Sequence, residues 1–227
     1  MIIYGKQICA TLMQRHPELI ERFLLAKEVD KKEFSKIKKI GKPVERVDPK
    51  RAQALARGGN HQGWLCEVKP YCYADFSELK DADFLVVLAG LTDVGNIGAI
   101  IRTAYALGAD GVIASGVKQL QSEALIRTSA GAMFDMPVAI VPNLLDLLNE
   151  LKQGGFTLYG AAVGGEPIEE AEIDRKRVLV LGSEGEGIAR RALQKMERIV
   201  SVRMAREFDS LNVSAAAAIL IYRMGHA

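Results

Sequence analysis

Several features that define whole classes of proteins are scarce or absent in this chain of 227 residues. Its three cysteines, Cys9, Cys66 and Cys72, provide neither a disulfide framework nor a paired zinc-ligand spacing, and its three histidines lie far apart. No apolar run approaches the roughly 20 residues needed to cross a bilayer, and the start of the chain lacks the pattern of a signal peptide. We therefore expect a cytoplasmic protein without a metal site.

A net charge of only +2 conceals an uneven distribution of charge. Residues 1–70 carry 15 Lys and Arg against 8 Asp and Glu, a net charge of +7, whereas the remainder of the chain is net −5. A basic module of this size is typical either of a nucleic-acid-binding surface or of one that is simply well solvated. If the chain binds a polyanion, the N-terminal part is the expected partner.

The order of apolar and amphipathic segments predicts two α/β domains. In the first, we expect helices at residues 8–13, 31–40 and 49–56 and strands at 23–26, 43–47 and 64–68. A glycine-rich loop, residues 57–63, precedes the last of these strands. The polar and aromatic stretch that follows suits a linker. We therefore predict a domain at 1–70, a linker at 71–80 and a second domain at 81–227.

Buried strands alternate with helices in the second domain. Continuous apolar runs at 84–89, 111–114, 138–141, 156–162 and 178–181 are typical of a parallel sheet covered on both faces. We expect Asn96 to cap a helix that ends near Gly108, and Gly154 and Gly155 to end a helix at 144–151. Ligands of such sheets bind at the carboxyl ends of the strands.

Three loops rich in glycine and polar residues follow these strands, at 91–98, 182–187 and 204–212, and together they predict one composite site. The last loop leads through Ser210 and Asn212 into four alanines and an apolar helix, which on its own also fits a capped, buried C-terminal helix. The glycine order in 182–187 does not fit a dinucleotide fingerprint, and no phosphate-binding G-x-x-x-x-G-K-[ST] motif occurs.

Taken together, the segments 96–104, 181–187 and 204–214 resemble the three successive motifs of the SpoU (TrmH-like) RNA 2′-O-ribose methyltransferases. Residues 129–132 also resemble the family, and residues 1–70 resemble the L30e-like substrate-binding domain of many members. The most similar branch is that of the bacterial 23S rRNA guanosine 2′-O-methyltransferases. The resemblance implies a small N-terminal L30e-like α/β domain, a C-terminal α/β-knot (SPOUT) catalytic domain, a homodimer and S-adenosylmethionine (AdoMet) as cofactor.

The same resemblance implies roles for individual residues. The matching catalytic positions are Arg102, Asn96, Glu184, Ser210 and Asn212. The matching cofactor positions are Ala161, Gly182, Glu184, Val202, Met204, Ser210 and Leu211. RNA contacts are expected from His61, Gln62 and Arg102, although His61 and Gln62 also fit ordinary turn residues. Because arginine stays protonated at neutral pH, we expect Arg102 to bind a phosphate and stabilise a developing alkoxide more than to act as a base.

Two residues depart from the family pattern. Arg203 stands where most members have proline, and Arg206 stands where a glycine is usual. Both add positive charge that could contact the RNA backbone. Two alternative functions stay open from the sequence, which are methylation of tRNA in place of rRNA, and a non-catalytic RNA-binding or ribosome-assembly protein with the same fold.

Overall fold

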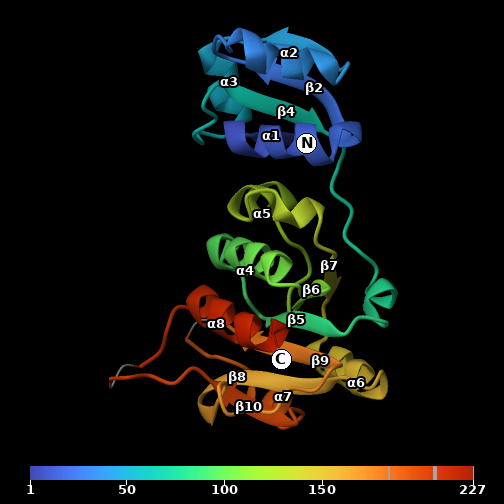
Figure 1. Cartoon of the computed structure of the whole chain (residues 1–227), viewed down its shortest axis with the longest axis vertical. Coiled ribbons are helices and arrows are strands. Elements are labelled where there is room, and N and C mark those ends of the chain that lie inside the picture. The colour runs from blue at the N-terminus through green and yellow to red at the C-terminus, as the bar shows by residue number, and fades with distance from the viewer. Residues whose placement is uncertain (184, 207–208, 227) are drawn as a thin grey trace.

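The computed structural model describes residues 1–183, 185–206 and 209–226, and these form two sheets with their covering helices (Figure 1). The first sheet has the strand order β1-β4-β2-β3, in which β4 is antiparallel to β1 and β2, while β2 and β3 are parallel. Its elements are β1 (Ile2–Tyr4), α1 (Lys6–Arg15), η1 (Pro17–Leu19), β2 (Ile20–Leu25), α2 (Lys31–Lys39), β3 (Val44–Arg46), α3 (Pro49–Leu55) and β4 (Trp64–Val68).

The second sheet has six strands, all parallel, in the order β10-β8-β9-β5-β6-β7. The predicted parallel sheet is therefore confirmed. A 3-10 turn, η2 (Phe76–Leu79), leads into this domain. Its elements are β5 (Phe84–Ala89), α4 (Val94–Ala106), β6 (Gly111–Ser115), α5 (Ser122–Thr128), η3 (Ala132–Phe134), β7 (Val138–Val141), α6 (Leu144–Gln153), β8 (Thr157–Pro167), β9 (Arg177–Gly182), α7 (Arg190–Leu193), β10 (Arg198–Ser201) and α8 (Val213–Gly225).

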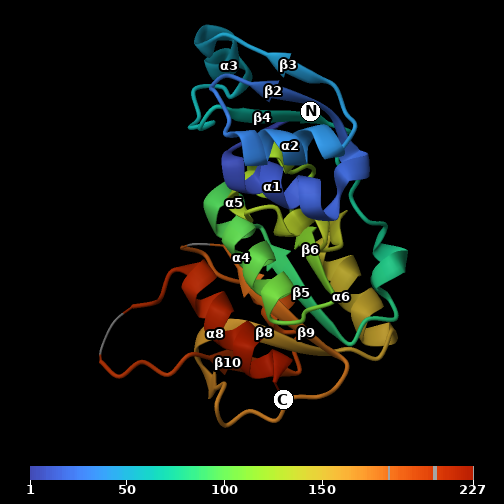
Figure 2. The ribbon, with the colours of Figure 1, turned by 45° about the horizontal axis from the view of Figure 1, so that its top comes forward.

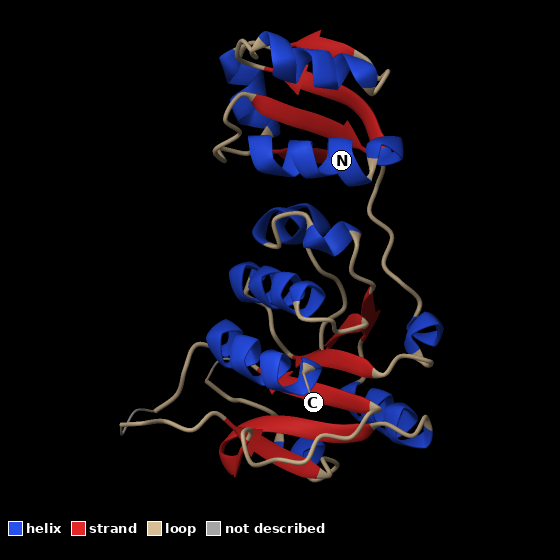
Figure 3. Cartoon of the chain, in the orientation of Figure 1, coloured by secondary structure: helices blue, strands red, loops and turns tan. Residues whose placement is uncertain are grey.

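Alternating residues of the central strand β5 divide the core between the two faces of this sheet. Val86 and Leu88 pack with α4 and α8, whereas Leu85 and Val87 pack with α6 and α7. Figure 3 shows helices on both sides of the strands. Because both faces are covered, the central strands are largely apolar, which is why the positions of five of the six strands could be predicted from the sequence; the edge strand β10, which begins at Arg198, was not predicted.

The helix that begins the first predicted motif starts earlier than expected. Asp93, not Asn96, is its N-cap, and the Asp93 carboxylate accepts a hydrogen bond of 2.7 Å from the backbone N–H of Asn96. The prediction that Asn96 caps the helix is therefore wrong. Asp93 is also a preferred capping residue, and the two residues could not be separated by type alone. The helix at 144–151 is confirmed, and Gly155, with φ 82°, follows its end.

The C-terminal part of the chain reverses direction across the sheet. After β9 the chain goes to the edge, where β10 pairs with β8, and α8 then returns to pack on α4 and β9 (Figure 2). The close packing expected of the last helix is seen at its end, where a Cβ at Gly225 would lie 2.5 Å from the carbonyl oxygen of Leu107. The threading of this segment through a knot stays a prediction from the family resemblance.

The two sheets share one hydrophobic core. Figures 1 and 2 both show α1 lying directly against α5, and a single cluster of buried residues joins α1 and β2 of the first sheet to α4 and α5 of the second. Tyr71, in the connection between the sheets, packs on Phe134. Within the described ranges, no helix is long and apolar enough to span a membrane, and no three His, Cys, Asp or Glu side chains gather as a metal site would require.

Candidate functional site

A cavity of about 820 Å³ opens at the carboxyl ends of β8, β9 and β10. Figure 2 shows these three strands side by side next to α8. The cavity is lined by residues 161–164, 181–183, 185–188, 200–204 and 209–213, with Leu193, Ala216 and Leu220. Two of the three predicted loops, those after β9 and β10, therefore meet here, at the edge where parallel sheets bind ligands.

The cavity brings together the residues that the family resemblance assigns to the cofactor. All predicted cofactor positions that the structure describes line the cavity. They are Ala161, Gly182, Val202, Met204, Ser210 and Leu211. Asn212, a predicted catalytic residue, lines it as well. Glu184 lies outside the described residues. These positions come from three separate segments of the sequence, and only the fold places them around one space.

The turn after β9 depends on Gly182. Ser183 and Gly187 form two backbone hydrogen bonds of 2.9 and 3.2 Å, which bring Gly187 back to the end of the strand. A Cβ at Gly182 would lie 2.1 Å from the carbonyl carbon of Gly187 and 2.3 Å from the backbone nitrogen of Ile188. No side chain fits there. This cavity wall is therefore made of backbone, which can form hydrogen bonds with a ligand at close range.

Asn212 forms the other wall as a helix cap. Its side-chain oxygen accepts hydrogen bonds from the Ser214 backbone N–H at 2.9 Å and from the Ser214 hydroxyl at 2.6 Å. Of the two residues that could cap the last helix, Ser210 and Asn212, the structure has Asn212 as the N-cap. The N-terminal end of α8, where backbone N–H groups and the helix dipole give partial positive charge, is thereby fixed at the cavity.

The two arginines that depart from the family pattern differ in their surroundings. Arg203 lines the cavity and forms an ion pair with Glu170, a residue of the segment between β8 and β9. Arg198 pairs with Glu172 of the same segment at 3.3 Å and with Glu166 of β8 at 3.4 Å. The charge of Arg203 is therefore matched within the protein, in contrast to the RNA contact expected of it. Arg206 is exposed and forms no ion pair with the residues that the structure describes.

The residues expected near the ribose do not all lie at the cavity. Arg102 is exposed on α4, and it is not among the residues that line the cavity. It forms no hydrogen bond or ion pair with any described residue. Asn96 is partly buried in the first turn of the same helix, also outside the lining. Within one chain, the cofactor positions are thus assembled while Arg102 remains on a neighbouring surface.

His61 and Gln62 belong to a structured loop in the first domain. His61 Nδ1 accepts a hydrogen bond of 3.0 Å from the Gly63 backbone, and Gln62 Oε1 accepts one of 3.2 Å from the Lys6 backbone. Gln62 has φ 53°, which is uncommon for a residue other than glycine. His61 and Gln62, two of the three predicted RNA-binding residues, are therefore separate from the cavity. Each already uses a hydrogen-bond acceptor to shape the loop.

Family models match both domains. The model of the SpoU rRNA methylase family matches residues 83–222, well over half of the chain. The chain belongs to the SpoU rRNA methylase family. A second model, described as RNA 2′-O ribose methyltransferase substrate binding, matches residues 2–74. The protein is therefore an RNA methyltransferase of the SpoU type, as the resemblance of its motifs predicted.

Relatives of this SpoU methylase share both domains. A putative TrmH family tRNA/rRNA methyltransferase of Staphylococcus aureus is 30% identical over 236 aligned residues, which cover 98% of this chain and 94% of the relative. An uncharacterised tRNA/rRNA methyltransferase of Synechocystis is 34% identical over 81% of this chain, but this chain spans only 50% of that longer protein. Among solved structures, an AdoMet-bound rRNA methyltransferase from Sinorhizobium meliloti superimposes with a TM-score of 0.77 and 21% identity, covering 99% of this chain and 86% of the other.

One wall of the SpoU methylase cavity was not predicted from the sequence. Ala162, Val163 and Gly164, in the outer half of β8, line the cavity, and Val163 is 80% exposed at its rim. Of this strand, only Ala161 was predicted to be near the cofactor. A signal was available, because a run of small residues, 160–165, follows the apolar start of the strand and would let a ligand approach the backbone closely.

Proposed function

We propose that this SpoU methylase transfers a methyl group from AdoMet to a ribose 2′-hydroxyl of RNA, most specifically a guanosine of 23S rRNA. The observation that carries the proposal is the cavity, in which the outer half of β8 meets the segments after β9 and β10 and which the family's cofactor positions line. Its volume of about 820 Å³ suits a ligand of the size of AdoMet. The Sinorhizobium protein, which has the same fold, is an rRNA methyltransferase with AdoMet bound.

The lining fits AdoMet in chemical terms. Gly182 allows the backbone of Gly187 and Ile188 to pack directly against the end of β9, and the backbone groups of this wall can form hydrogen bonds with an adenosine or amino-acid moiety. Leu181, Ile188 and Leu220 supply apolar walls. We assign cofactor binding to backbone groups at Gly182, Val202 and Leu211. Ala161, Met204 and Ser210 are assigned to the same cofactor site. AdoMet, when bound, supplies the activated methyl group.

The protein's own part in the reaction is then to hold and polarise the ribose. The 2′-oxygen would gain the methyl group as the bond between the methyl carbon and sulfur breaks, and its proton would pass to solvent water. We assign to Arg102 the binding of the adjacent phosphate and the stabilisation of negative charge on that oxygen, because a guanidinium does this without giving up a proton. Asn96, Ser210 and Asn212 are assigned to the same ribose site, as is Glu184.

A homodimer accounts for the position of Arg102. The exposed side of α8 presents Ile219, 40% exposed, and Tyr222, 58% exposed, and α8 packs beside α4, which carries Arg102. Apolar side chains in a stripe on one helix are typical of a helix that packs on a partner. We propose that a second copy binds there and that Arg102 of each copy serves the cavity of the other.

Mixing two inactive variants tests this arrangement. Arg102→Ala is expected to lose nearly all activity, as is a variant of the cofactor cavity such as Gly182→Val. If Arg102 acts across the dimer, the mixed dimer regains one intact site of its two, and activity returns to about half or less of the wild-type value. A mixture as inactive as each variant alone would contradict this arrangement. Light scattering gives the mass of wild type and of Tyr222→Glu, and a monomeric wild type would exclude the dimer.

The substrate is tested by methylation of unmodified RNA in parallel. The favoured substrate is 23S rRNA, because the substrate-binding module at residues 2–74 accompanies the methylase domain and supplies the excess of basic charge. With radioactive AdoMet, we expect label in 23S rRNA and in neither 16S rRNA nor tRNA. Preferential labelling of tRNA would refute the rRNA assignment but leave the enzyme class intact. Such an enzyme would act in the cytoplasm, where ribosomes are assembled in bacteria.

A further inference from the structure

The substrate-binding module is held on the methyltransferase domain by specific contacts, in addition to the connecting segment. The last turn of α1 lies over η3, and the middle of α1 lies over the turn at Gly131, where a Cβ would be 3.4 Å from the side chain of Thr11. Gly131 has φ 87°. Residues of the two domains belong to one buried cluster here. The seam between the domains is therefore packed as a protein interior is.

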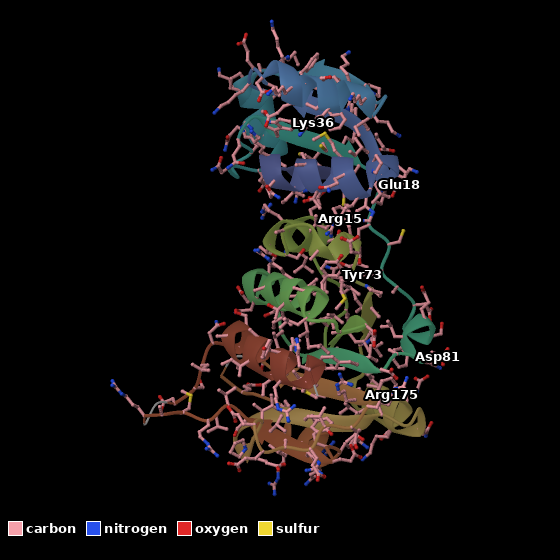
Figure 4. All side chains as sticks on the ribbon, in the orientation of Figure 1. Arg15, Glu18, Lys36, Tyr73, Asp81 and Arg175 are labelled. Atoms are coloured by element: carbon pink, nitrogen blue, oxygen red, sulfur yellow. The ribbon has the colours of Figure 1, made fainter. Side chains whose placement is uncertain are left out.

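Asp135 is the polar centre of this seam. Its carboxylate accepts a hydrogen bond of 2.7 Å from the Arg15 guanidinium and lies 2.9 Å from His16 Nε2 through its other oxygen. The Asp135 side chain is only 19% exposed. The hydrogen bond to Asp135 and then its charge raise the pKa of Arg15. Figure 4 shows Arg15 at the seam, on the side of α1 that faces the lower domain.

The same arginine reaches the helix of the proposed catalytic residue. Arg15 donates a hydrogen bond of 3.2 Å to the Tyr105 hydroxyl, and its guanidinium lies 5.7 Å from the centre of the Tyr105 ring. Tyr105 is three residues beyond Arg102 on α4, so the two side chains occupy neighbouring positions on one face of the helix. A direct chain of contacts thus runs from Asp135 through Arg15 to α4.

A second set of contacts fixes the other end of the seam. Arg127 on α5 donates a hydrogen bond of 2.5 Å to the Tyr4 hydroxyl, with its guanidinium 4.8 Å from the centre of the Tyr4 ring. Arg57 lies 3.5 Å from Glu123, at the start of α5. Arg57 begins the loop of His61 and Gln62. Because the Arg127–Tyr4 and Arg57–Glu123 contacts lie at separate points, the first domain cannot rotate about either of them. The loop therefore has a defined position relative to the catalytic domain.

We propose that Asp135 is a positioning residue, which through Arg15 and His16 sets the distance and orientation between the RNA-binding module and the methyl-transfer cavity. RNA held by the module then presents one ribose to the cavity, and the seam determines which. This inference rests on the proposed function, because it assumes that RNA contacts both domains at once. Asp135 is ion-paired and remote from the cavity. We therefore expect it to affect the rate of methyl transfer and not the binding of RNA or AdoMet.

Separate measurement of binding and rate tests the proposal. In Asp135→Asn, we expect the single-turnover rate at saturating RNA and AdoMet to fall about tenfold, because small misplacement of reacting groups is costly. The Kd values for 23S rRNA and for AdoMet should stay within about twofold of wild type. Asp135→Glu, which keeps the charge, should recover most of the rate. A rate for Asp135→Asn within twofold of wild type would overturn the proposal.

Controls separate this role from a loss of folding. Glu150→Gln removes the Lys80–Glu150 ion pair of 2.7 Å, which is remote from the seam, and should leave the rate unchanged. If Asp135→Asn does not fold, the Arg15→Met variant replaces it, because the Arg15 side chain is 47% exposed and we expect its substitution to leave the fold intact. It should lower the rate with unchanged binding, and a wild-type rate would refute the proposal.

Failure of the proposed function would be recognised separately. A wild-type protein that methylates no RNA removes the function, whereas the seam is still tested by hydrogen exchange. Asp135→Asn should raise the exchange of the amides of η3 and of the last turn of α1. Exchange equal to wild type at both places would show that Asp135 does not hold the domains together.

Discussion

Substitution of Gly182 by alanine is the most specific test of the cavity wall. The added Cβ would lie 2.1 to 2.4 Å from three backbone atoms of Gly187 and Ile188. Ordinary contact between such atoms needs about 3.5 Å, so the backbone of Gly187 and Ile188 must move by roughly 1 Å. Backbone atoms cannot rotate away as a side chain does. Overpacking of this kind costs about 1–3 kcal/mol of the free energy of unfolding.

The displaced turn is expected to weaken cofactor binding as well as folding. Because the displaced turn lines the cavity, the Kd for AdoMet should rise at least about tenfold, or 1.4 kcal/mol, in isothermal titration calorimetry. Tm should fall by about 2–4 °C for each kcal/mol lost in a chain of this size. Gly154→Ala, at the end of α6, is the matched control, because its Cβ would meet neighbours at 3.3 to 3.6 Å. A wild-type Kd for Gly182→Ala would refute the assignment of this turn to the cofactor.

Two further substitutions test the neighbouring walls. Asn212→Ala should cost about 1 kcal/mol of stability through loss of the helix cap, and equal Tm for wild type and Asn212→Ala would contradict the capping role. Asn212→Ser should restore Tm, because serine also caps helices. It should not restore activity if the Asn212 amide also contacts the ribose. Glu170→Gln should change stability by less than about 1 kcal/mol, because the Arg203–Glu170 pair is exposed, but it should free Arg203 to bind a phosphate. The slope of log Kd for RNA against the logarithm of salt concentration should then steepen by about one, which corresponds to one additional phosphate contact. An unchanged slope would show that Arg203 does not face the RNA.

The sheet and its site could be predicted because both depend on local sequence patterns. Apolar runs such as Phe84–Ala89 mark strands buried on both faces, and the carboxyl ends of parallel strands are where ligand loops lie. A cap at Ser210 or Asn212 was predictable for the same reason, and the structure has it at Asn212. At the start of α4, however, Asp93 and Asn96 are both suitable caps, and only the backbone conformation decides between them.

Tertiary contacts account for what the sequence did not indicate. The partner of Arg203, Glu170, is 33 residues away, and Asp135 lies 120 residues from Arg15. No local pattern links such pairs, and a charged residue of this kind looks like a solvated surface position until the fold is known. The segment from Tyr71, expected to be a linker, likewise packs against Phe134 because the two domains meet there.

The central claim is that this chain methylates the 2′-oxygen of a ribose in RNA, and nucleoside analysis after reaction tests it most directly. Unmodified 23S rRNA is incubated with the purified full chain and labelled AdoMet, digested to nucleosides and separated by chromatography with mass detection. We predict a single labelled product, 2′-O-methylguanosine, that is absent when Arg102→Ala replaces the wild type. Label on a base, or wild-type protein that leaves rRNA and tRNA unlabelled, would contradict the account.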